Sequence, residues 1–475
     1  MPFDINAAIP LLKKYRAEIP HIEHVTSLAL KIFDDIKKEL YLPEKYRKIL
    51  KAAALLHDIG YTAGPLRHPE HSRDIVKKES IAGVSGPEKE ACLEIILRHG
   101  KNSPPLSGTQ REVKDKKILI CSGILRIADG LDHSHIQDCR LKKITIENRR
   151  MKFELSENVY KGNISAASRK GRLLKKVCGL ETDFWDLTKR RSYFPYSHLI
   201  KKDIPVSEAL RKILFFHYRT MTENMGEKLY KGNDTKPLHD FRVASRRFLT
   251  VLKTYKKFLP ESEARKAKQS LKYIYKNLGK PRDYDVKYSY FNSIKNSGEN
   301  TYPQFRDFLH KLESERNNSK EKLEKTVKSD EFIKMIKSIL WLLRVALPHS
   351  TKDREKTFNS LFSKTAGKKI RRLYGYNPED FSENPEKMHS LRKKFRKARY
   401  ISELYTGIRT EKYLKQVKKI KKLTGLLGDI HDRDVFLKYY KKKTGLSKNK
   451  LTDKIKSERS QTVREFISGY EKFIL

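Results

Sequence analysis

The chain has 475 residues, of which 104 are Lys or Arg and 58 are Asp or Glu, so its formal net charge at pH 7 is +46. This length is ample for two or three domains with hydrophobic cores. No apolar run approaches the roughly 18–20 residues that a membrane span needs, so we expect no membrane insertion. The four cysteines form no CxxC pair, which disfavours a disulfide or zinc framework and predicts a reducing cytoplasm.

Most of the positive charge lies in the second part of the chain. Residues 196–475 hold 67 Lys or Arg and 33 Asp or Glu, which accounts for +34 of the net +46. Such a field attracts polyanions, whether nucleic acid, inorganic polyphosphate or an anionic membrane surface. The alternative is a lysine-rich chain whose charged helix faces are only solvated.

Hydrophobic periodicity predicts helices from residue 1 to about 135, because residues 27–36, 46–56, 88–99 and 117–131 place apolar side chains at i, i+3, i+4 and i+7. The alternating segments KKITIEN and MKFELS then predict a β-hairpin, followed by a helix near 163–177. Residues 190–206 are the predicted linker, and nearly everything beyond them is helical. We therefore predict a mainly α protein with domains at 1–195 and 203–475, the first carrying a hairpin-and-helix appendage at about 140–190.

Five histidine- and aspartate-rich phrases indicate a metal site in the first domain: HIEH (21–24), LLHDIGY (55–61), HPEHS (68–72), ILRHG (96–100) and ILRIADGLDHSH (124–135). His and Asp are good ligands for a divalent transition metal. A bound metal would lower the pKa of a water and polarise a phosphoryl oxygen. The nearby cations Arg98, Lys101 and Arg126 are candidates for balancing phosphate charge.

The spacing of these phrases resembles the HD phosphohydrolase superfamily. The resemblance implies that His24, His57, Asp58 and Asp129 bind a first divalent ion, such as Mn²⁺ or Mg²⁺, with Asp58 bridging or orienting the hydroxide. His71 and His99 match the histidines that hold a second ion in some members, so one or two ions are expected. The remaining histidines of the region are interpreted as structural: His21, His68, His133 and His135.

A narrower resemblance covers roughly residues 15–190. The phrases LALKIF, AALLHDIGY, EHS, RHG and LRIADGLDHSH, followed by two strands and a helix, resemble the C-terminal half of the Ppx/GppA exopolyphosphatase and guanosine pentaphosphate phosphatase family. The actin-like half of that family, with its catalytic carboxylate, has no counterpart in this sequence. Any hydrolysis is therefore expected from the metal site alone. Tyr61 stands where the cyclic-di-GMP phosphodiesterase branch has Lys, which argues against that substrate.

The second domain repeats a basic phrase, LHDFRVASRR (238–247) and MHSLRKKFRKAR (388–399), and each copy is followed by a matching phrase, LGKPRDYDV (278–286) and LGDIHDRDV (427–435). At about 100° per residue, the His and the first two Arg of each copy share a narrow arc of one helix, opposite the apolar residues. Such stripes are almost free of acidic residues, unlike an ordinary solvated face. A planar guanidinium can bind phosphate oxygens bidentately.

This double pattern resembles the CHAD family, the conserved-histidine α-helical domain, over 203–475. The resemblance implies two four-helix bundles, about 203–345 and 350–475, with a basic channel between them that binds inorganic polyphosphate. By position, the implied polyphosphate-binding residues are His239, Arg242, Arg246, Arg247, His389, Arg392, Lys393, Arg396 and Arg399. The aspartates of the matching phrases (Asp283, Asp285, Asp432 and Asp434) either cap a following helix or pair with channel arginines; a carboxylate metal site is the least favoured reading.

Three functions fit these observations. The first is a metal-dependent phosphohydrolase acting on polyphosphate or a related phosphoanhydride or nucleotide, with a second domain that binds polyphosphate. The second is a non-catalytic polyphosphate-binding or granule-associated protein. The third is a nucleic-acid-binding protein, which is disfavoured because the 24 tyrosines form no recognisable RNA- or DNA-reading motif. We expect a cytoplasmic protein, on polyphosphate granules if the second function holds; the sequence leaves the oligomeric state open and is compatible with a homodimer.

Overall fold

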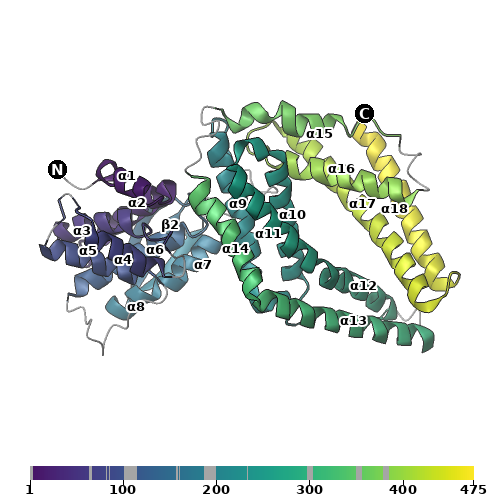
Figure 1. Ribbon diagram of the computed structural model, residues 1–475, viewed down its shortest axis with the longest axis horizontal. Helices are drawn as coiled ribbons and strands as arrows, with labels where there is room; N and C mark the ends of the chain where they lie inside the picture. Colours follow the sequence, from purple (N-terminus) through teal and green to yellow (C-terminus); the bar gives the residue numbers. More distant parts are fainter. Residues whose placement is uncertain are drawn as a thin grey trace. The chain divides into compact units, whose positions relative to one another are not determined.

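The computed structural model describes residues 4–474 except 64–66, 82, 85, 101–114, 157–158, 160, 187–198, 233, 297–302, 349–355 and 378–383. The chain divides into two compact units, unit 1 (Met1–Tyr193 with Leu343–Ser350) and unit 2 (Phe194–Leu342 with Thr351–Leu475). Most described residues are helical, which confirms the mainly α prediction (Figure 1). Within the described ranges, no helix is long and apolar enough to cross a membrane.

Unit 1 is a set of helices with one small sheet. Its elements are α1 (Ile5–Lys14), α2 (Ile19–Ile36), α3 (Glu44–Leu56), α4 (His68–Lys78), α5 (Gly86–Arg98), α6 (Lys116–Leu131), β1 (Leu141–Glu147), β2 (Arg150–Leu155), α7 (Lys161–Lys170), α8 (Arg172–Cys178) and β3 (Glu181–Asp186). Residues 343–350, which span the predicted boundary between the two repeats of the second domain, belong to this unit.

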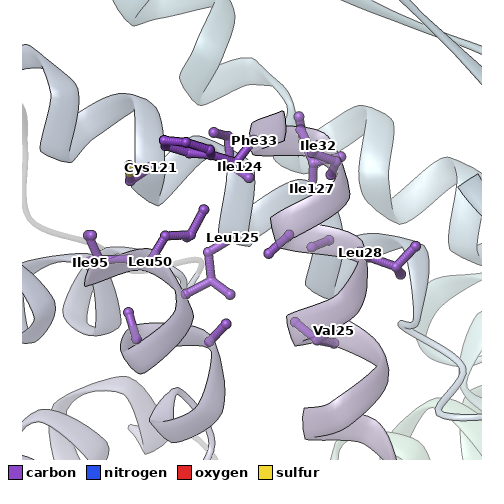
Figure 2. Close-up of a cluster of buried hydrophobic side chains, with 14 of the residues drawn as sticks. Val25, Leu28, Ile32, Phe33, Leu50, Ile95, Cys121, Ile124, Leu125 and Ile127 are labelled. Atoms are coloured by element: carbon purple, nitrogen blue, oxygen red, sulfur yellow. The ribbon is translucent and has the colours of Figure 1, made fainter. Parts of the chain in front are cut away.

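Helix α6 lies at the centre of the unit 1 core. Its apolar side chains, among them Ile124 and Leu125, pack with residues of α2, α3 and α5 (Figure 2). Small residues let neighbouring helices come close: a Cβ at Gly130 would lie 2.6 Å from the Cα of Ala167 in α7. This burial of apolar surface holds the ends of several helices at fixed positions around α6.

The predicted hairpin is confirmed and extended by a third strand. Strands β1 and β2 pair antiparallel, with Ile144 opposite Phe153, and β3 adds parallel to β2, with Phe184 opposite Phe153. The predicted helix at 163–177 is divided at Gly171 into α7 and α8. Together they form the crossover that a parallel neighbour requires. Strand β3 was not predicted because ETDFWD alternates only weakly.

Unit 2 is almost entirely helical. Its elements are α9 (Val206–Glu223), η1 (Gly226–Leu229), α10 (Lys236–Thr254), η2 (Lys256–Phe258), α11 (Glu261–Asn277), α12 (Gly279–Asn296), α13 (Pro303–Lys328), α14 (Asp330–Trp341), η4 (Phe358–Leu361), η5 (Ser363–Gly367), α15 (Lys368–Arg371), α16 (Pro385–Glu403), α17 (Glu411–Thr444) and α18 (Lys450–Ile474). Helix α10 packs on α9 and α11, and α17 packs on α16 and α18, beside which it runs in Figure 1.

The sequence repeat corresponds to repeated helices. The basic phrases form α10 and α16, and the two matching phrases lie at the start of α12 and in the middle of α17. In the second copy α17 is one continuous helix, whereas in the first copy α11 ends and α12 begins at this point. The difference follows from Pro281, which occupies the position of Ile430. A proline inside a helix removes a backbone hydrogen bond and clashes with the preceding turn.

Candidate functional site

The His–Asp pair of unit 1 lies at the C-terminal end of α3. The helix ends at Leu56, and its buried apolar face delivers His57 and Asp58 to the interior, where they are 0% and 4% exposed. The turn that follows depends on Gly60, because a Cβ there would lie 2.2 Å from the backbone nitrogen of Ser72 in α4. The Ser72 hydroxyl accepts a hydrogen bond from the Gly60 N–H at 2.9 Å. Glycine therefore brings α4 against the pair.

Two groups of side chains are close enough to hold a metal ion: His21 with His57 and Asp129, and His57 with Asp58 and His99. The two oxygens of Asp58 face different histidines. Oδ2 lies 3.7 Å from Nε2 of His21 and 3.8 Å from Nε2 of His57, and Oδ1 lies 3.6 Å from Nε2 of His99. Asp58 belongs to the second group, and its Oδ2 also faces His21 of the first.

The histidines of these groups are oriented through their second ring nitrogen. Nδ1 of His57 lies 2.8 Å from the carbonyl oxygen of Ala54, and Nδ1 of His99 lies 2.6 Å from that of Ile96. A carbonyl can only accept, so these Nδ1 atoms carry the proton and leave Nε2 with a free lone pair. The Nε2 atoms of His21 and His57 are buried without a hydrogen-bond partner among the described residues. This is the arrangement typical of metal-ligating histidines.

His21 has a carboxylate in the same role. Its Nδ1 lies 2.8 Å from Oδ2 of Asp132, and its Nε2 lies 3.6 Å from Oδ1 of Asp129. Burial lowers the pKa of His21, but the interactions with Asp129 and Asp132 outweigh burial and raise it to about 9. His21 is therefore protonated at pH 7 without a metal, and a divalent ion bound there would displace the proton from Nε2. Burial lowers the pKa of His57 to about 3, so this ring is neutral at pH 7.

The carboxylates of the site are ionised. Burial opposes the charged form of Asp58, but Arg344 and the neighbouring histidines hold its pKa well below the ordinary value. The pKa of Asp129 is lowered in the same way, against burial, by Lys170 and His21. A neutral imidazole beside ionised carboxylates is the donor set that a divalent transition metal requires. We call His21, His57, Asp58, His68, His99 and Asp129 the histidine–aspartate site.

The structure brings together a different set of histidines from the one expected. His21, interpreted as structural, belongs to the first group, whereas His24 belongs to neither. His21 is fully buried on the face of α2 that carries Val25 and Leu28, and His24 is less buried. The two histidines are three residues apart, so the helical periodicity places them on nearby positions and did not separate them.

The positions of His68 and His71 also differ from the expectation. Nε2 of His68 lies 3.3 Å from Oδ1 of Asp58 and 3.1 Å from Nε2 of His99. His71, the expected ligand, is not in either group; its backbone packs against Gly60 instead. No local pattern marks His68, because its position follows from the docking of the first residue of α4 against the turn after α3.

The cations expected to balance phosphate charge are Arg98, Arg126 and Lys101. Arg98 is 1% exposed and donates to Glu94 on its own helix, so its charge is already paired. Arg126 is half-buried, and burial lowers its pKa while Asp129 raises it. Lys101 lies outside the described residues. Among the described residues, Lys170 pairs with Asp129 and Arg344 pairs with Asp58; neither contact was predicted.

In unit 2 the two basic stripes meet. Arg246 of α10 donates to the hydroxyl of Tyr400 of α16 at 3.0 Å. Burial lowers the pKa of both Arg392 and Arg396, and the nearby charge of Arg246 lowers both further. Mutual repulsion of this kind indicates a surface that gains stability when an anion binds. We call Arg242, Arg246, Arg392 and Arg396 the basic cluster.

Arg242 is held at the edge of this cluster. Its Nη1 donates to the carbonyl oxygen of Gly279 at 2.8 Å and to Asp283 at 3.1 Å, and its Nη2 donates to the Tyr275 hydroxyl at 3.4 Å. Of the two readings of the repeated aspartates, pairing applies here, since Asp283 contacts a stripe arginine. Burial raises the pKa of Tyr275, but Arg242 and the charges of Arg246 and Arg396 outweigh it and lower the pKa.

The second aspartate of each phrase has a different partner. Asp285 accepts from Arg316 of α13 at 2.7 Å, and both side chains are buried. Asp434 accepts from Arg459 of α18 at 2.5 Å. The pairs occupy equivalent positions of the two repeats. They join helices of one repeat to each other, so these aspartates neither cap a helix nor bind the stripe.

Arg247 and Arg399 have a structural role that the sequence comparison did not imply. Both pair with Glu403, a carboxylate that is 2% exposed, at 2.5 Å and 2.8 Å. Residue 247 lies 100° round the helix from residue 246 and faces Glu403 instead of the stripe. These two arginines join α10 to α16 through Glu403, a contact that the sequence did not predict.

The stripe histidines lie beside cations and are neutral at pH 7. Nδ1 of His389 lies 3.3 Å from Nδ1 of His431. Burial, with Arg392 and His389 adding to it, lowers the pKa of His431 to about 4. Burial lowers the pKa of His239, and Arg282 lowers it further. Burial, followed by Lys393, lowers the pKa of His389. The rings of His431, His239 and His389 are therefore mainly neutral at pH 7 and act there as donors or acceptors.

Comparison with known families identifies both parts of the chain. Residues 6–164 match the model described as Ppx/GppA phosphatase, domain III, and residues 212–439 match that of the CHAD domain. These matches support two of the resemblances noted in the sequence, to the Ppx/GppA family in the first part of the chain and to the CHAD family in the second.

The chain is also similar to curated phosphatases over part of its length. It is 27% identical over 126 residues to a guanosine-5'-triphosphate,3'-diphosphate pyrophosphatase of Aeromonas hydrophila subsp. hydrophila, which covers 26% of this chain and 25% of the relative. A relative of the same description from Aeromonas salmonicida is 26% identical over 126 residues, with the same coverage. The chain therefore spans about a quarter of the length of these curated relatives. Among solved structures, the CHAD domain of the plant Ricinus communis aligns with 57% of this chain and 93% of its own, at 15% identity and a TM-score of 0.44.

Proposed function

We propose that this protein is a metal-dependent phosphohydrolase that releases phosphate from polyphosphate or a related phosphoanhydride at the histidine–aspartate site, and that unit 2 binds inorganic polyphosphate through the basic cluster. The observation that carries the hydrolytic part is the orientation of His21, His57 and His99. Each has its Nδ1 bound to an oxygen, which directs Nε2 toward Asp58 or Asp129.

The residues suit a divalent ion in number and kind. His21, His57 and Asp129 would hold one ion, and Asp58 with His99 and His68 would complete a second position. A bound Mn²⁺ or Mg²⁺ supplies a hydroxide at neutral pH and polarises a phosphoryl oxygen. The protein side chains exclude water from the donors, hold the ring tautomers and keep the carboxylates ionised.

The test is phosphate release from long-chain polyphosphate and from guanosine pentaphosphate by the full chain, with and without Mn²⁺ or Mg²⁺. His57→Ala combined with Asp58→Ala should abolish both release and stoichiometric metal binding. Arg47→Gln is the matched control, because Arg47 pairs with Asp34 on the surface of the same unit. If metal-loaded wild-type protein released no phosphate from either substrate, the hydrolytic proposal would be wrong.

A second candidate is supported by unit 2 alone: a polyphosphate-binding protein without turnover. Arg246 lies close enough to Arg392 and Arg396 to lower the pKa of both, in addition to the effect of burial, and this repulsion favours a polyanion. Binding driven by charge should weaken steeply with salt, by analogy with counterion release from nucleic acid. Arg396→Glu should weaken binding at low salt, and unchanged binding would exclude the basic cluster. Competition between polyphosphate and RNA of equal charge separates this function from nucleic-acid binding.

A further inference from the structure

Residues 343–347 bring an arginine into the interior of unit 1. They follow α14 in the chain and form a π-helical turn over Leu342–Ala346. The apolar neighbours of Arg344 are fully or almost fully buried, with Leu343 at 0%, Val345 at 2% and Leu347 at 1% exposure. Burial of these side chains holds the segment in place. Short π-helical turns occur frequently at functional sites.

The guanidinium of Arg344 is fixed by three groups. Nη2 donates to Oδ2 of Asp58, Nε donates to Oε2 of Glu18 at 3.3 Å, and the guanidinium carbon lies 3.5 Å from the centre of the Tyr61 ring. Arg344 is 8% exposed. A buried arginine held on both edges and one face has a single orientation before any ligand arrives.

Part of the donor capacity of Arg344 remains available. A guanidinium carries five N–H donors. Within the described ranges, the bonds to Glu18 and Asp58 use the N–H on Nε and one on Nη2, and the Tyr61 hydroxyl is a further hydrogen-bond partner, which leaves at least two N–H donors. The Nη1 pair is adjacent to Nη2 and therefore to Asp58. The remaining donors are disposed as a planar fork beside the carboxylate that faces both groups of histidines. Two parallel N–H donors match two oxygens of a phosphoryl group.

We propose that Arg344 is a phosphate-binding residue of the histidine–aspartate site, with its free N–H donors directed to the oxygens of the phosphoryl group. This inference rests on the proposed phosphohydrolase function and names a residue that binds its substrate. Arg344 would bind inorganic phosphate or the terminal phosphoryl group of a phosphoanhydride. In this arrangement Glu18 and Tyr61 position the guanidinium, and Asp58 is shared between Arg344 and the histidines.

A different role for Arg344 would be to neutralise Asp58 only. A guanidinium on Oδ2 would then compete with a divalent ion for the same oxygen, and removing it would tighten metal binding. The two roles differ in what they do to phosphate affinity, so the measurement must follow metal and phosphate separately.

The experiment uses the full chain and two titrations. Mn²⁺ is titrated into metal-free protein by calorimetry, and inorganic phosphate is then titrated into Mn²⁺-saturated protein. Arg344→Gln should weaken phosphate binding at least tenfold and change Mn²⁺ affinity less than threefold. Arg344→Lys retains the charge but not the fork, and should recover only part of the loss. Arg47→Gln removes a surface guanidinium of unit 1 and should match wild type in both titrations.

The outcomes separate this inference from the proposed function. If Arg344→Gln bound phosphate as wild type does while binding Mn²⁺ more tightly, the arginine would be a competitor of the metal and the inference would be overturned. Should the glutamine variant fail to fold, wild-type phosphate affinity in Arg344→Lys has the same consequence. A wild-type protein that binds phosphate but releases none from polyphosphate overturns the hydrolysis alone, and the affinities still decide the role of Arg344.

Discussion

Arg246 and Arg247 are neighbours in the chain, yet the structure assigns them opposite roles, and this can be tested by the same substitution at each. Arg246 lies in the basic cluster and donates to Tyr400. Arg247 pairs with Glu403 at 2.5 Å, with side-chain exposures of 12% and 2%. We expect Arg246→Gln to change ligand affinity and Arg247→Gln to change stability.

The magnitudes follow from burial and pairing. Breaking a buried ion pair by removing one partner costs about 3–5 kcal/mol. Arg399 still contacts Glu403 at 2.8 Å in the variant, so we expect the lower end, about 3 kcal/mol, for Arg247→Gln. Removing Arg246 loses its bond to Tyr400 but also relieves repulsion with Arg392 and Arg396, so the free energy of unfolding should change by less than about 1 kcal/mol.

The effect on binding is the reverse. A hydrogen bond to a charged partner contributes about 1.5–3 kcal/mol, so Arg246→Gln should weaken polyphosphate binding roughly ten- to a hundredfold. Arg246→Gln should also reduce the slope of log K against log salt concentration by about one, where K is the association constant for polyphosphate, by analogy with loss of a phosphate contact in nucleic acid. Arg247→Gln should leave the affinity within about threefold at temperatures where it is folded.

The assays are urea unfolding followed by circular dichroism and calorimetric titration of polyphosphate of defined length. Arg265→Gln is the control, because its ion pair with Glu261 is exposed and should affect neither quantity. Equal losses of affinity in Arg246→Gln and Arg247→Gln would refute the separation into ligand-facing and structural arginines.

Three further outcomes follow from the structure. Polyphosphate affinity should stay nearly constant from pH 8 to 6 and rise toward pH 4, because the pKa of His431 is lowered to about 4 and protonation of this ring adds positive charge. His431→Gln should reduce the rise, and a steep rise centred near pH 6.5 would contradict the role given to His431. Gly60→Ala should lower the melting temperature and the Mn²⁺ affinity, because the added Cβ would lie 2.2 Å from a backbone nitrogen of α4. Gly425→Ala is the control, since Gly425 faces open space within α17 and the substitution should stabilise the protein by about 0.5–1 kcal/mol. Equal effects of the two variants in thermal melts would argue against the close packing at Gly60. Asp285→Asn should cost about 3 kcal/mol in urea unfolding and Asp434→Asn less, because the second pair is more exposed; the opposite order would contradict the burial.

Much of the secondary structure could be predicted because it depends on local pattern. The apolar repeats of α2, α3, α5 and α6 and the alternation of β1 and β2 are properties of neighbouring residues, and the structure has these elements where the sequence placed them. The arc shared by Arg242 and Arg246 also follows from helical geometry alone. Strand β3 escaped prediction because its pairing with β2 depends on the crossover through α7 and α8.

The composition of the sites was only partly determined by sequence. His57, Asp58, His99 and Asp129 were identifiable from their motifs, and these residues lie together. Whether His21 or His24 faces the other ligands depends on how α2 packs, which helical periodicity alone does not decide. The contacts of His68 with Asp58 and His99 depend on how α4 docks against Gly60.

The sequence by itself determined the chemistry available to this protein: a set of histidines and aspartates at helix ends, and two helices with cationic stripes. Only the tertiary structure decided which of these side chains meet. Asp58 and Arg344 are 286 residues apart in the chain, and Arg247, which the CHAD resemblance implied as a polyphosphate ligand, pairs with Glu403. Contacts between distant residues depend on the packing of whole helices, because local sequence preferences do not determine which two buried charged side chains will meet.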